Sequence, residues 1–445
     1  MKDTLKFLLC VLAGTLCLML DAFYNGFPIV YSDTSTYIAS GFEFETPFDR
    51  PITYGLFLRI FSLNGLSLWF VIFFQALILS YLIFLLIRVI TDEKSFLKFG
   101  LLTIIFLSMF TGLSWTVSQL MPDIFTSIGL LCATLILFGN FKRAILILLH
   151  VLFFLSVAMH LSHVLLFSVL LIAIFFFRNY ILPKHDFPKR NFNISMLFLL
   201  TIFSITTMGS AMSKSKHVFF IGAMVEHGIV KKYLYDNCDT KQYKLCAYKD
   251  SLPDRAYKFV WDEKSPFYKI GGWKETRSEF NEIIYGTLTQ PKYIWLHIKE
   301  SFKATLSQLT QFKIGDGNGS FLKGTLLFER ISKYFSRDLT SYSASKQNQS
   351  QLNLLNYFNL LFSIIIILSL LLFLFFRLKF KNVFNGQLKS TTILFFIGVL
   401  FNAWDCGTFA NAIDRLGCKM IWLISFTTII TLLKILYSRR RNLQT

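Results

Sequence analysis

Long apolar runs separated by short polar segments extend along most of the chain. A helix needs about 20 predominantly apolar residues to cross a bilayer. The run at 144–177 is too long for one span at about 1.5 Å of rise per residue, so we divide it at His160, where polarity rises; one tilted, broken helix is the alternative. We predict ten membrane-spanning helices, at 4–22, 65–87, 99–116, 123–139, 144–159, 162–177, 194–212, 353–376, 390–404 and 418–437.

The composition agrees with this pattern. Hydrophobic residues make up 54% of the chain and charged residues only 16%. A soluble core stops growing at roughly 250–300 residues, so a soluble protein of 445 residues could not bury this much apolar surface. The expected fold class is an all-α polytopic membrane protein with a mostly helical outer domain.

Basic residues set the expected orientation. If the N-terminus is cytoplasmic, every inner connection carries lysine or arginine, and so does the tail at 439–441. This matches the positive-inside rule and places both termini in the cytoplasm of a bacterial inner membrane. The net charge of +19 then serves orientation and anionic lipid headgroups, and no nucleic-acid partner is needed to explain it.

The predicted spans divide the chain into three parts. Residues 1–212 form an N-terminal transmembrane module with an acidic first outer loop at 23–64, and 353–445 form a C-terminal module. Between them, 213–352 is an outer domain, and so long a connection is usually functional. Within it we expect helices at 275–290 and from Pro291 to about Phe312, a turn at 315–320 and a polar linker at 340–352.

Two cysteines fall in the outer domain. Cys238 and Cys246 could close a small disulfide loop in an oxidising compartment, although the sequence alone cannot prove the pairing.

Candidate chemistry begins in the acidic loop. Asp33, Glu43, Glu45 and Asp49 lie between two apolar spans, among aromatic residues. Carboxylates are costly beside lipid and usually have a task, so the loop indicates a reaction centre at the mouth of a membrane enzyme. A solvated connector is the alternative.

Two residues of this loop have defined roles in that hypothesis. Asp33, among neighbouring hydroxyls, could act as a general base, and a helix N-cap is the alternative. Arg50 could bind a lipid phosphate, and a local salt bridge with Asp49 is the alternative.

Other polar residues could join the site from later segments. Arg415, just before the last span, could bind a phosphate, or anchor the helix at the interface. Lys214 and Lys216 suit an anionic lipid-linked donor, although a solvated basic face is favoured. For His160 and His163 a polar lining is favoured over a metal or phosphate site. For Asp123, capping of the fourth span is favoured.

Several motifs are absent from the sequence. It contains no Walker A loop, GxGxxG, HExxH or paired CxxC, so no site for soluble nucleotide chemistry is visible. No inverted repeat is visible, and few polar residues, chiefly Gln75 and His150, fall inside the predicted spans. A transporter is therefore the less favoured class.

With these residues placed, the chain resembles the GT-C superfamily of integral-membrane glycosyltransferases. The resemblance is carried by Asp33 with Tyr37, by the patch Arg50-Pro51-Ile52-Thr53-Tyr54, and by Arg415 before the last span. Ile52 stands where the family patch has a second proline, and Leu416 where the late patch has a tyrosine.

This resemblance implies a polyprenyl-phosphate-linked sugar as donor and a lipid, glycan or protein as acceptor. Asp33 would be the base, with Asp49 or Glu43 assisting or binding a divalent cation. Donor or phosphate contacts would come from Arg50, Tyr37, Tyr54, Lys214, Lys216, Arg415, His160 and His163. A surface-polysaccharide polymerase or ligase and a lipid-linked substrate flippase are the alternatives.

Overall fold

The computed structural model describes residues 2–91, 95–181, 187–209 and 211–442. Within these ranges the chain is helical, and its one extended pairing is an isolated parallel bridge between Ile29 and Gln119. The all-helical class predicted from the sequence is therefore confirmed.

Helices of the first half belong mainly to the apolar body of the molecule. Their bounds are α1 (Lys2–Leu18), α2 (Leu20–Asn25), α3 (Ser32–Glu43), α4 (Thr53–Phe61), α5 (Trp69–Ile90), α6 (Phe96–Phe110), α7 (Leu113–Ser118), α8 (Ile124–Phe138), α9 (Arg143–Ala158), α10 (Leu161–Phe176), α11 (Arg178–Ile181) and α12 (Phe187–Thr207). The break predicted near His160 is confirmed, because α9 ends at Ala158 and α10 begins at Leu161, while the division into two membrane spans stays a prediction.

The second half contains short outer helices followed by three long ones. The outer helices are α13 (Ala211–Glu226), α14 (Ile229–Asn237), η2 (Lys244–Tyr248), α15 (Ala256–Trp261), α16 (Pro266–Lys269), α17 (Gly272–Glu275), α18 (Arg277–Thr289), α19 (Pro291–Leu309), α20 (Leu326–Tyr334), η3 (Ser336–Asp338) and α21 (Leu339–Ser343). The chain then continues through α22 (Leu355–Lys379), η4 (Lys381–Val383), α23 (Gly386–Phe409) and α24 (Asp414–Asn442).

Four helices in the described part of the chain are long and apolar enough to cross a membrane. They are α5, α22, α23 and the segment Asp414–Ser438 of α24. The helices α6, α8, α9 and α10 are apolar but shorter, and they occupy the positions of other predicted spans. Four membrane-crossing helices are thus supported, and the total of ten stays a prediction.

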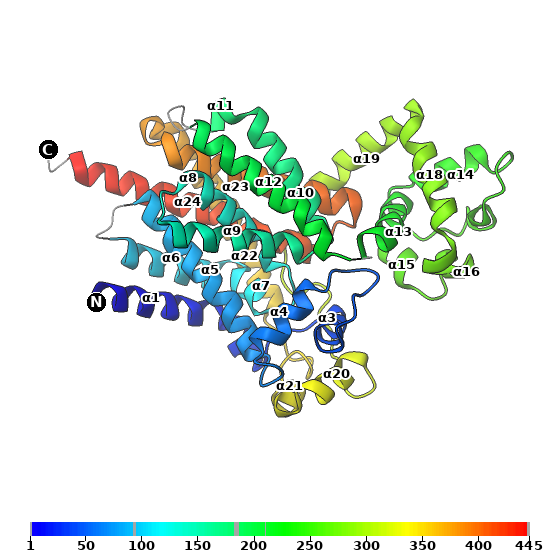
Figure 1. Cartoon of the computed structure of the whole chain (residues 1–445), viewed down its shortest axis with the longest axis horizontal. Coiled ribbons are helices and arrows are strands. Elements are labelled where there is room, and N and C mark those ends of the chain that lie inside the picture. Colours follow the sequence, from blue (N-terminus) through cyan, green and yellow to red (C-terminus); the bar gives the residue numbers. More distant parts are fainter. Residues whose placement is uncertain (1, 92–94, 182–186, 210, 443–445) are drawn as a thin grey trace.

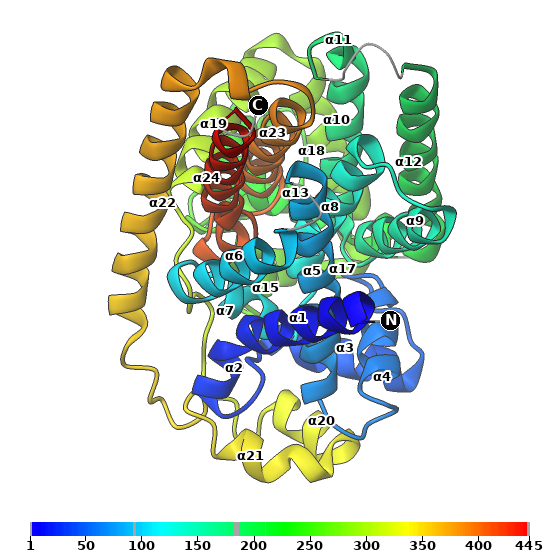
Figure 2. The same ribbon diagram turned by 90° about the vertical axis from the view of Figure 1, so that its left-hand side faces the viewer.

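The helices form an elongated body with a separate outer unit (Figure 1). The start of α1 and the end of α24 lie at the same end of the molecule, and α13–α18 lie at the opposite end. Viewed end-on, α22 runs along one side of the bundle and α12 along the other (Figure 2). Two hydrophobic cores correspond to these parts: one joins the long helices, and the other lies within 218–293.

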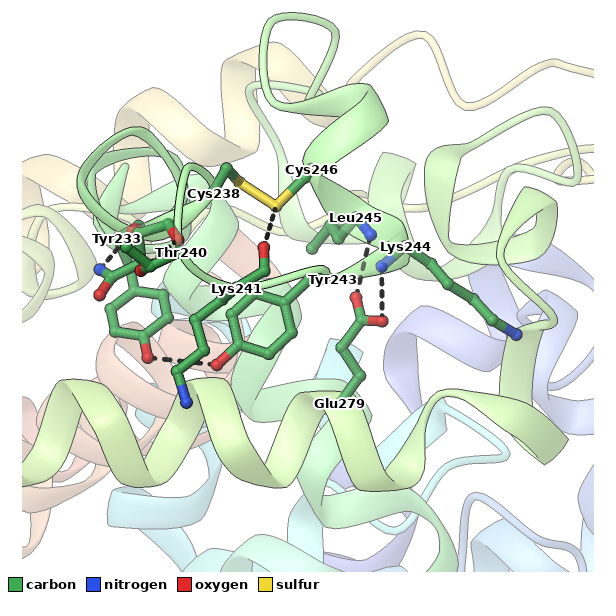
Figure 3. Close-up of a disulfide and its surroundings, with 10 residues drawn as sticks. Tyr233, Cys238, Thr240, Lys241, Tyr243, Lys244, Leu245, Cys246 and Glu279 are labelled. Carbon is green, nitrogen blue, oxygen red and sulfur yellow. Dashed lines mark hydrogen bonds between the residues drawn. A yellow bond between two sulfur atoms is a disulfide. The ribbon is translucent and has the colours of Figure 1, made fainter.

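The smaller core supports the predicted disulfide. Cys238 and Cys246 are bonded, which confirms the pairing left open by the sequence. Close to this bond, the Glu279 carboxylate accepts the backbone N–H groups of Lys244 and Leu245, at 2.8 and 3.0 Å (Figure 3). The loop between the cysteines is thereby fixed to α18.

The polar segment predicted as a linker at 340–352 leads to α22, and part of it is buried. Gln347 is 3% exposed, and its amide group bonds both the N–H and the carbonyl of Val30, at 3.1 and 2.7 Å. The Gln347 N–H also donates to the Asn25 side chain, at 2.8 Å. Polar side chains are used here for buried hydrogen bonds to the loop before α3, a role that hydropathy does not reveal.

Two glycines bring α3 and α4 into backbone contact. A Cβ added at Gly41 would lie 2.1 Å from the carbonyl oxygen of Gly55, far inside van der Waals contact. Only glycine fits at this crossing, and the close approach fixes the position of α3 relative to the chain around Arg50.

Candidate functional site

Asp33 is the centre of a cluster of charged side chains. It lies in the first turn of α3, where Tyr31 is the N-cap residue, so Asp33 does not serve as the cap. Its Oδ1 is 3.3 Å from Arg50 Nη2 and its Oδ2 is 3.5 Å from Arg415 Nη1. Two arginines from distant parts of the chain thus meet on one carboxylate.

The Asp33 carboxylate keeps a defined charge and some access to solvent. Burial acts to raise its pKa, but the positive charges of Arg50 and Arg415 outweigh burial and hold the pKa below its ordinary value. Its side chain remains 32% exposed, so a ligand can approach it. Asp33 is therefore ionised at neutral pH.

Arg50 is held by three neighbours. Asp49 Oδ2 accepts from its Nη2 at 2.6 Å and from its Nε at 3.0 Å, so the predicted local salt bridge is present. The guanidinium also lies over the Tyr37 ring, with Cζ 5.1 Å from the ring centroid. This cation–π contact adds to the ion pairs and orients Arg50 toward Asp33.

The tyrosines predicted as ligand contacts form a buried support beneath Arg50. Tyr37 and Tyr54 pack edge to face, with ring centroids 4.9 Å apart. The Tyr54 hydroxyl donates to Gln75 Oε1 at 2.7 Å, and Gln75 in turn donates to the carbonyls of Val117 and Gln119, each at 3.0 Å. Tyr54 therefore positions Tyr37 and does not itself face the charged cluster.

Arg415 is fixed from the other side. Its backbone N–H donates to Asp316 Oδ2 at 3.2 Å, at the start of α24. Its guanidinium lies over the Tyr31 ring, with Cζ 5.2 Å from the centroid, and the Tyr31 hydroxyl accepts from Gln119 Nε2 at 3.1 Å. Arg415 Nε is buried and makes no hydrogen bond within the described residues, so part of its donor capacity is unused.

Asp123 belongs to this cluster, contrary to the capping role favoured from the sequence. It occupies the N-cap position of α8 but makes no side-chain cap hydrogen bond. It is 7% exposed, its Oδ2 has no partner in the described part of the chain, and its charge acts on Arg415. The Asp123 carboxylate therefore adds negative charge to the surroundings of Arg415, and it does not hydrogen-bond to the start of α8.

The two histidines differ. His163 is fully bonded: its Nε2 lies 2.7 Å from Thr126 Oγ1 and its Nδ1 lies 2.7 Å from the Ser156 carbonyl, so its role is structural. His160 lies between α9 and α10. Burial lowers its pKa to about 3, and the charges of Lys419, Arg50 and Arg415 contribute in the same direction. His160 is therefore neutral, and the charges of all three cations act on it.

Three predicted residues lie elsewhere. Glu43 ends α3 and is paired with α20, where it contacts Arg330 and accepts from the Tyr334 hydroxyl at 2.8 Å. Lys214 and Lys216 are exposed on α13, and within the described ranges neither makes an ion pair with the Asp33 cluster. Glu43 is a structural link between helices, and the two lysines form a solvated face.

Sequence reasoning missed two charged residues next to the cluster. Lys419 is 2% exposed and Asp405 is 3% exposed, and both lie inside candidate spans. The charge of Lys419 acts on His160 and on Asp405. The available signal was their position within apolar helices, where ionisable residues are usually functional.

Two cavities lie away from the Asp33 cluster. One, of about 320 Å³, lies beside the disulfide loop and has polar walls that include Tyr243, Glu275 and Glu282. The other, of about 550 Å³, is a largely apolar groove between α9 and α12 that includes His150 and Phe203.

Metal ligands are not grouped in the described residues: no three histidine, cysteine, aspartate or glutamate side chains there lie close enough to hold an ion. No protein-family model, curated protein or solved structure matches the chain.

Proposed function

We propose that the chain is an integral-membrane glycosyltransferase of the GT-C type. It would move a sugar from a polyprenyl-phosphate-linked donor to a lipid, glycan or protein acceptor on the outer face of a bacterial inner membrane. The observation that carries this proposal is the meeting of Asp33 with Arg50 and Arg415 at the ends of apolar helices.

The two arginines suit the phosphate of the donor. Guanidinium groups bind phosphate through paired, charge-assisted hydrogen bonds. In the free protein they are shared with Asp33 and Asp49. A donor phosphate would compete for these groups, and the unused Nε of Arg415 gives it a donor that no acceptor among the described residues occupies.

Asp33 suits the role of general base. An acceptor hydroxyl beside it would lose its proton to the carboxylate and attack C1 of the sugar from the face opposite the phosphate. The bond between C1 and the phosphate oxygen would break, and its electron pair would leave with the lipid phosphate. Arg50 and Arg415 would stabilise the charge that develops there, and the configuration at C1 would be inverted.

The experiment compares matched carboxylate variants of the same loop. The wild type, Asp33→Asn and Glu45→Gln are expressed to equal levels, and membrane lipids and envelope glycans are quantified by mass spectrometry. Glu45 is exposed and lies outside the cluster, so Glu45→Gln controls for loss of a loop charge. The expected result is loss of product and accumulation of donor lipid for Asp33→Asn alone.

Two outcomes would contradict the proposal. Wild-type product levels in Asp33→Asn would exclude Asp33 as the base. Movement of a lipid-linked substrate across reconstituted membranes without any covalent product would favour the flippase alternative, which the buried charges of Asp405 and Lys419 make more plausible than the sequence suggested.

A further inference from the structure

The helix α19 exposes four large apolar side chains in the outer unit. Their exposed fractions are 68% for Trp295, 56% for Ile298, 65% for Phe302 and 50% for Leu306. At about 100° of rotation per residue the four positions fall within an arc of about 80°, so they share one helix face. These four residues form the α19 row. Contiguous exposed apolar surface of this kind usually marks a contact with a protein or a membrane.

The opposite face of α19 is fixed to the ends of α23 and α24. The Ser301 hydroxyl lies 2.8 Å from the Thr408 hydroxyl at the end of α23. The Gln308 side chain bonds both the carbonyl and the N–H of Ile413, at 2.9 and 3.0 Å, in the short link between α23 and α24. The C-terminal half of α19 therefore lies at the level where these two helices end (Figure 1).

This level indicates which part of a bilayer the α19 row meets. Because α23 and α24 are candidate membrane spans, the link between them marks a bilayer surface. Phe302 and Leu306 are within six positions of Gln308, which is about 9 Å along the helix. Trp295 is the member of the row farthest from the spans, and tryptophan is enriched at membrane–water interfaces. The row therefore begins where the apolar spans end.

Lysines line one flank of the α19 row. Lys299 and Lys303 are exposed and lie one helical turn apart. Lys303 pairs with Glu300 at 2.8 Å, yet its side chain remains 57% exposed. A helix with tryptophan, phenylalanine and leucine on one face and lysines beside them is typical of helices that lie in the bilayer interface. The lysine charges favour anionic headgroups there.

We propose that the α19 row inserts into the lipid interface beside α23 and α24, with Lys299 and Lys303 on the phosphates of anionic phospholipids. A bilayer fits the row better than a protein partner does, because the row continues from the ends of two candidate spans and its flanking charges are positive. This inference does not depend on the proposed function.

The lipid contact has a consequence for the outer unit. The start of α19 is fixed in the smaller core, where the Tyr293 hydroxyl donates to Asp236 Oδ2 at 2.8 Å. The end of α19 is fixed to the spans through Gln308. Lipid bound along the row between these two points holds the outer unit at the membrane surface.

Photocrosslinking in the membranes of the expressing cells identifies what covers the row. The full-length chain carries p-benzoylphenylalanine in place of Ile298, Phe302 or Leu306, one position per variant, and adducts are identified by mass after irradiation. We expect covalent phospholipid adducts. The replaced side chains are all exposed, so the label does not disturb the core, and any one variant that folds decides the question.

A matched label controls for unspecific reaction with lipid. Glu263 is exposed between α15 and α16 in the same outer unit, and p-benzoylphenylalanine at this position should form no phospholipid adduct. Equal lipid adducts at positions 263 and 302 would overturn the proposal. So would a label at 302 that captures a second copy of this chain, captures another protein, or captures nothing.

Nanodiscs that contain equal amounts of phosphatidylglycerol and phosphatidylcholine test the two lysines. An anionic membrane surface attracts a nearby lysine strongly enough for about a fivefold preference per residue. The label at position 302 should therefore capture phosphatidylglycerol about fivefold or more over phosphatidylcholine. Lys299→Gln/Lys303→Gln should bring this ratio close to one and leave total lipid capture within about twofold, whereas Lys264→Gln, at an exposed site outside α19, should leave the ratio unchanged.

The ratio decides the role of the lysines without any need for catalysis. A ratio near one before the lysines are changed, or one that Lys299→Gln/Lys303→Gln leaves unaltered, would contradict the assignment of anionic phospholipid to this face.

Discussion

Replacing Arg50 by glutamine tests whether the ionisation of Asp33 controls the reaction. Arg50 Nη2 lies 3.3 Å from Asp33, and Arg415 is the second cation, at 3.5 Å. Burial pushes the Asp33 pKa upward and the two arginines more than offset it. Without Arg50, only Arg415 opposes burial, so the pKa of Asp33 rises.

The size of the shift follows from the geometry. An opposite charge within about 4–6 Å lowers a carboxylate pKa by about 1–3 units. Because the Asp33 side chain is 32% exposed, solvent screens the pair, and we expect the lower end of that range, about 1 unit. One unit corresponds to about 1.4 kcal/mol.

The direction of the pH dependence follows from which protonation state of Asp33 the folded protein favours. In the wild type the ionised carboxylate is favoured, so its contribution to stability is complete above the ordinary aspartate pKa and is lost as the pH falls through the lowered value. If ionised Asp33 is the base, the acid limb of kcat/KM lies below the ordinary pKa in the wild type and about one unit higher in Arg50→Gln.

Initial rates in isolated membranes, measured from about pH 2 to pH 8, reveal the position of this limb. Arg50→Lys is the matched control, because it keeps the positive charge and should leave the limb in place while weakening bidentate phosphate binding. An Arg50→Gln profile that is lowered at every pH without displacement would refute the role assigned to Asp33.

Three further predictions concern the framework. Gly41→Ala should cost about 3 kcal/mol of stability, because the added Cβ would overlap the carbonyl of Gly55 in α4. Gly319→Ala is the control, because a Cβ added there would have its nearest neighbouring atom at 3.4 Å. Equal melting temperatures for the two variants would contradict this prediction. Cys238→Ser should lower the melting temperature by the equivalent of about 2–3 kcal/mol, because it removes the disulfide. Treating the wild type with a reductant should have the same effect, whereas Cys10→Ser, which changes a free cysteine, should leave the melting temperature unchanged. Glu43→Gln should cost about 1 kcal/mol of stability but leave product rates within about twofold; a tenfold loss of rate would restore a catalytic role.

Hydropathy was sufficient to predict the four long apolar helices, because a span is defined by its own length and composition. The break at His160, the helix from Pro291 and the four long apolar helices all follow from local sequence. The packing at 340–352 does not, since the buried bonds of Gln347 depend on Val30, 317 positions away in the chain.

The candidate site divides in the same way. Asp33, Arg50 and Arg415 could be selected from the sequence because they are charged residues beside apolar spans. The structure pairs Asp33 with both arginines. Glu43 satisfied the same criterion but is used by α20, because its partners lie 287 or more positions away and leave no local trace. Lys419 was overlooked because a single lysine hardly changes the mean hydropathy of a span.

A cryo-EM structure of the full chain in nanodiscs with a polyprenyl phosphate or diphosphate tests the central claim most directly. We expect phosphate density within about 3.5 Å of the Arg50 and Arg415 guanidinium groups, beside Asp33 and on the side of the membrane opposite both chain termini. Lipid phosphate bound only at other positions, with the arginines still closed on Asp33, would contradict it.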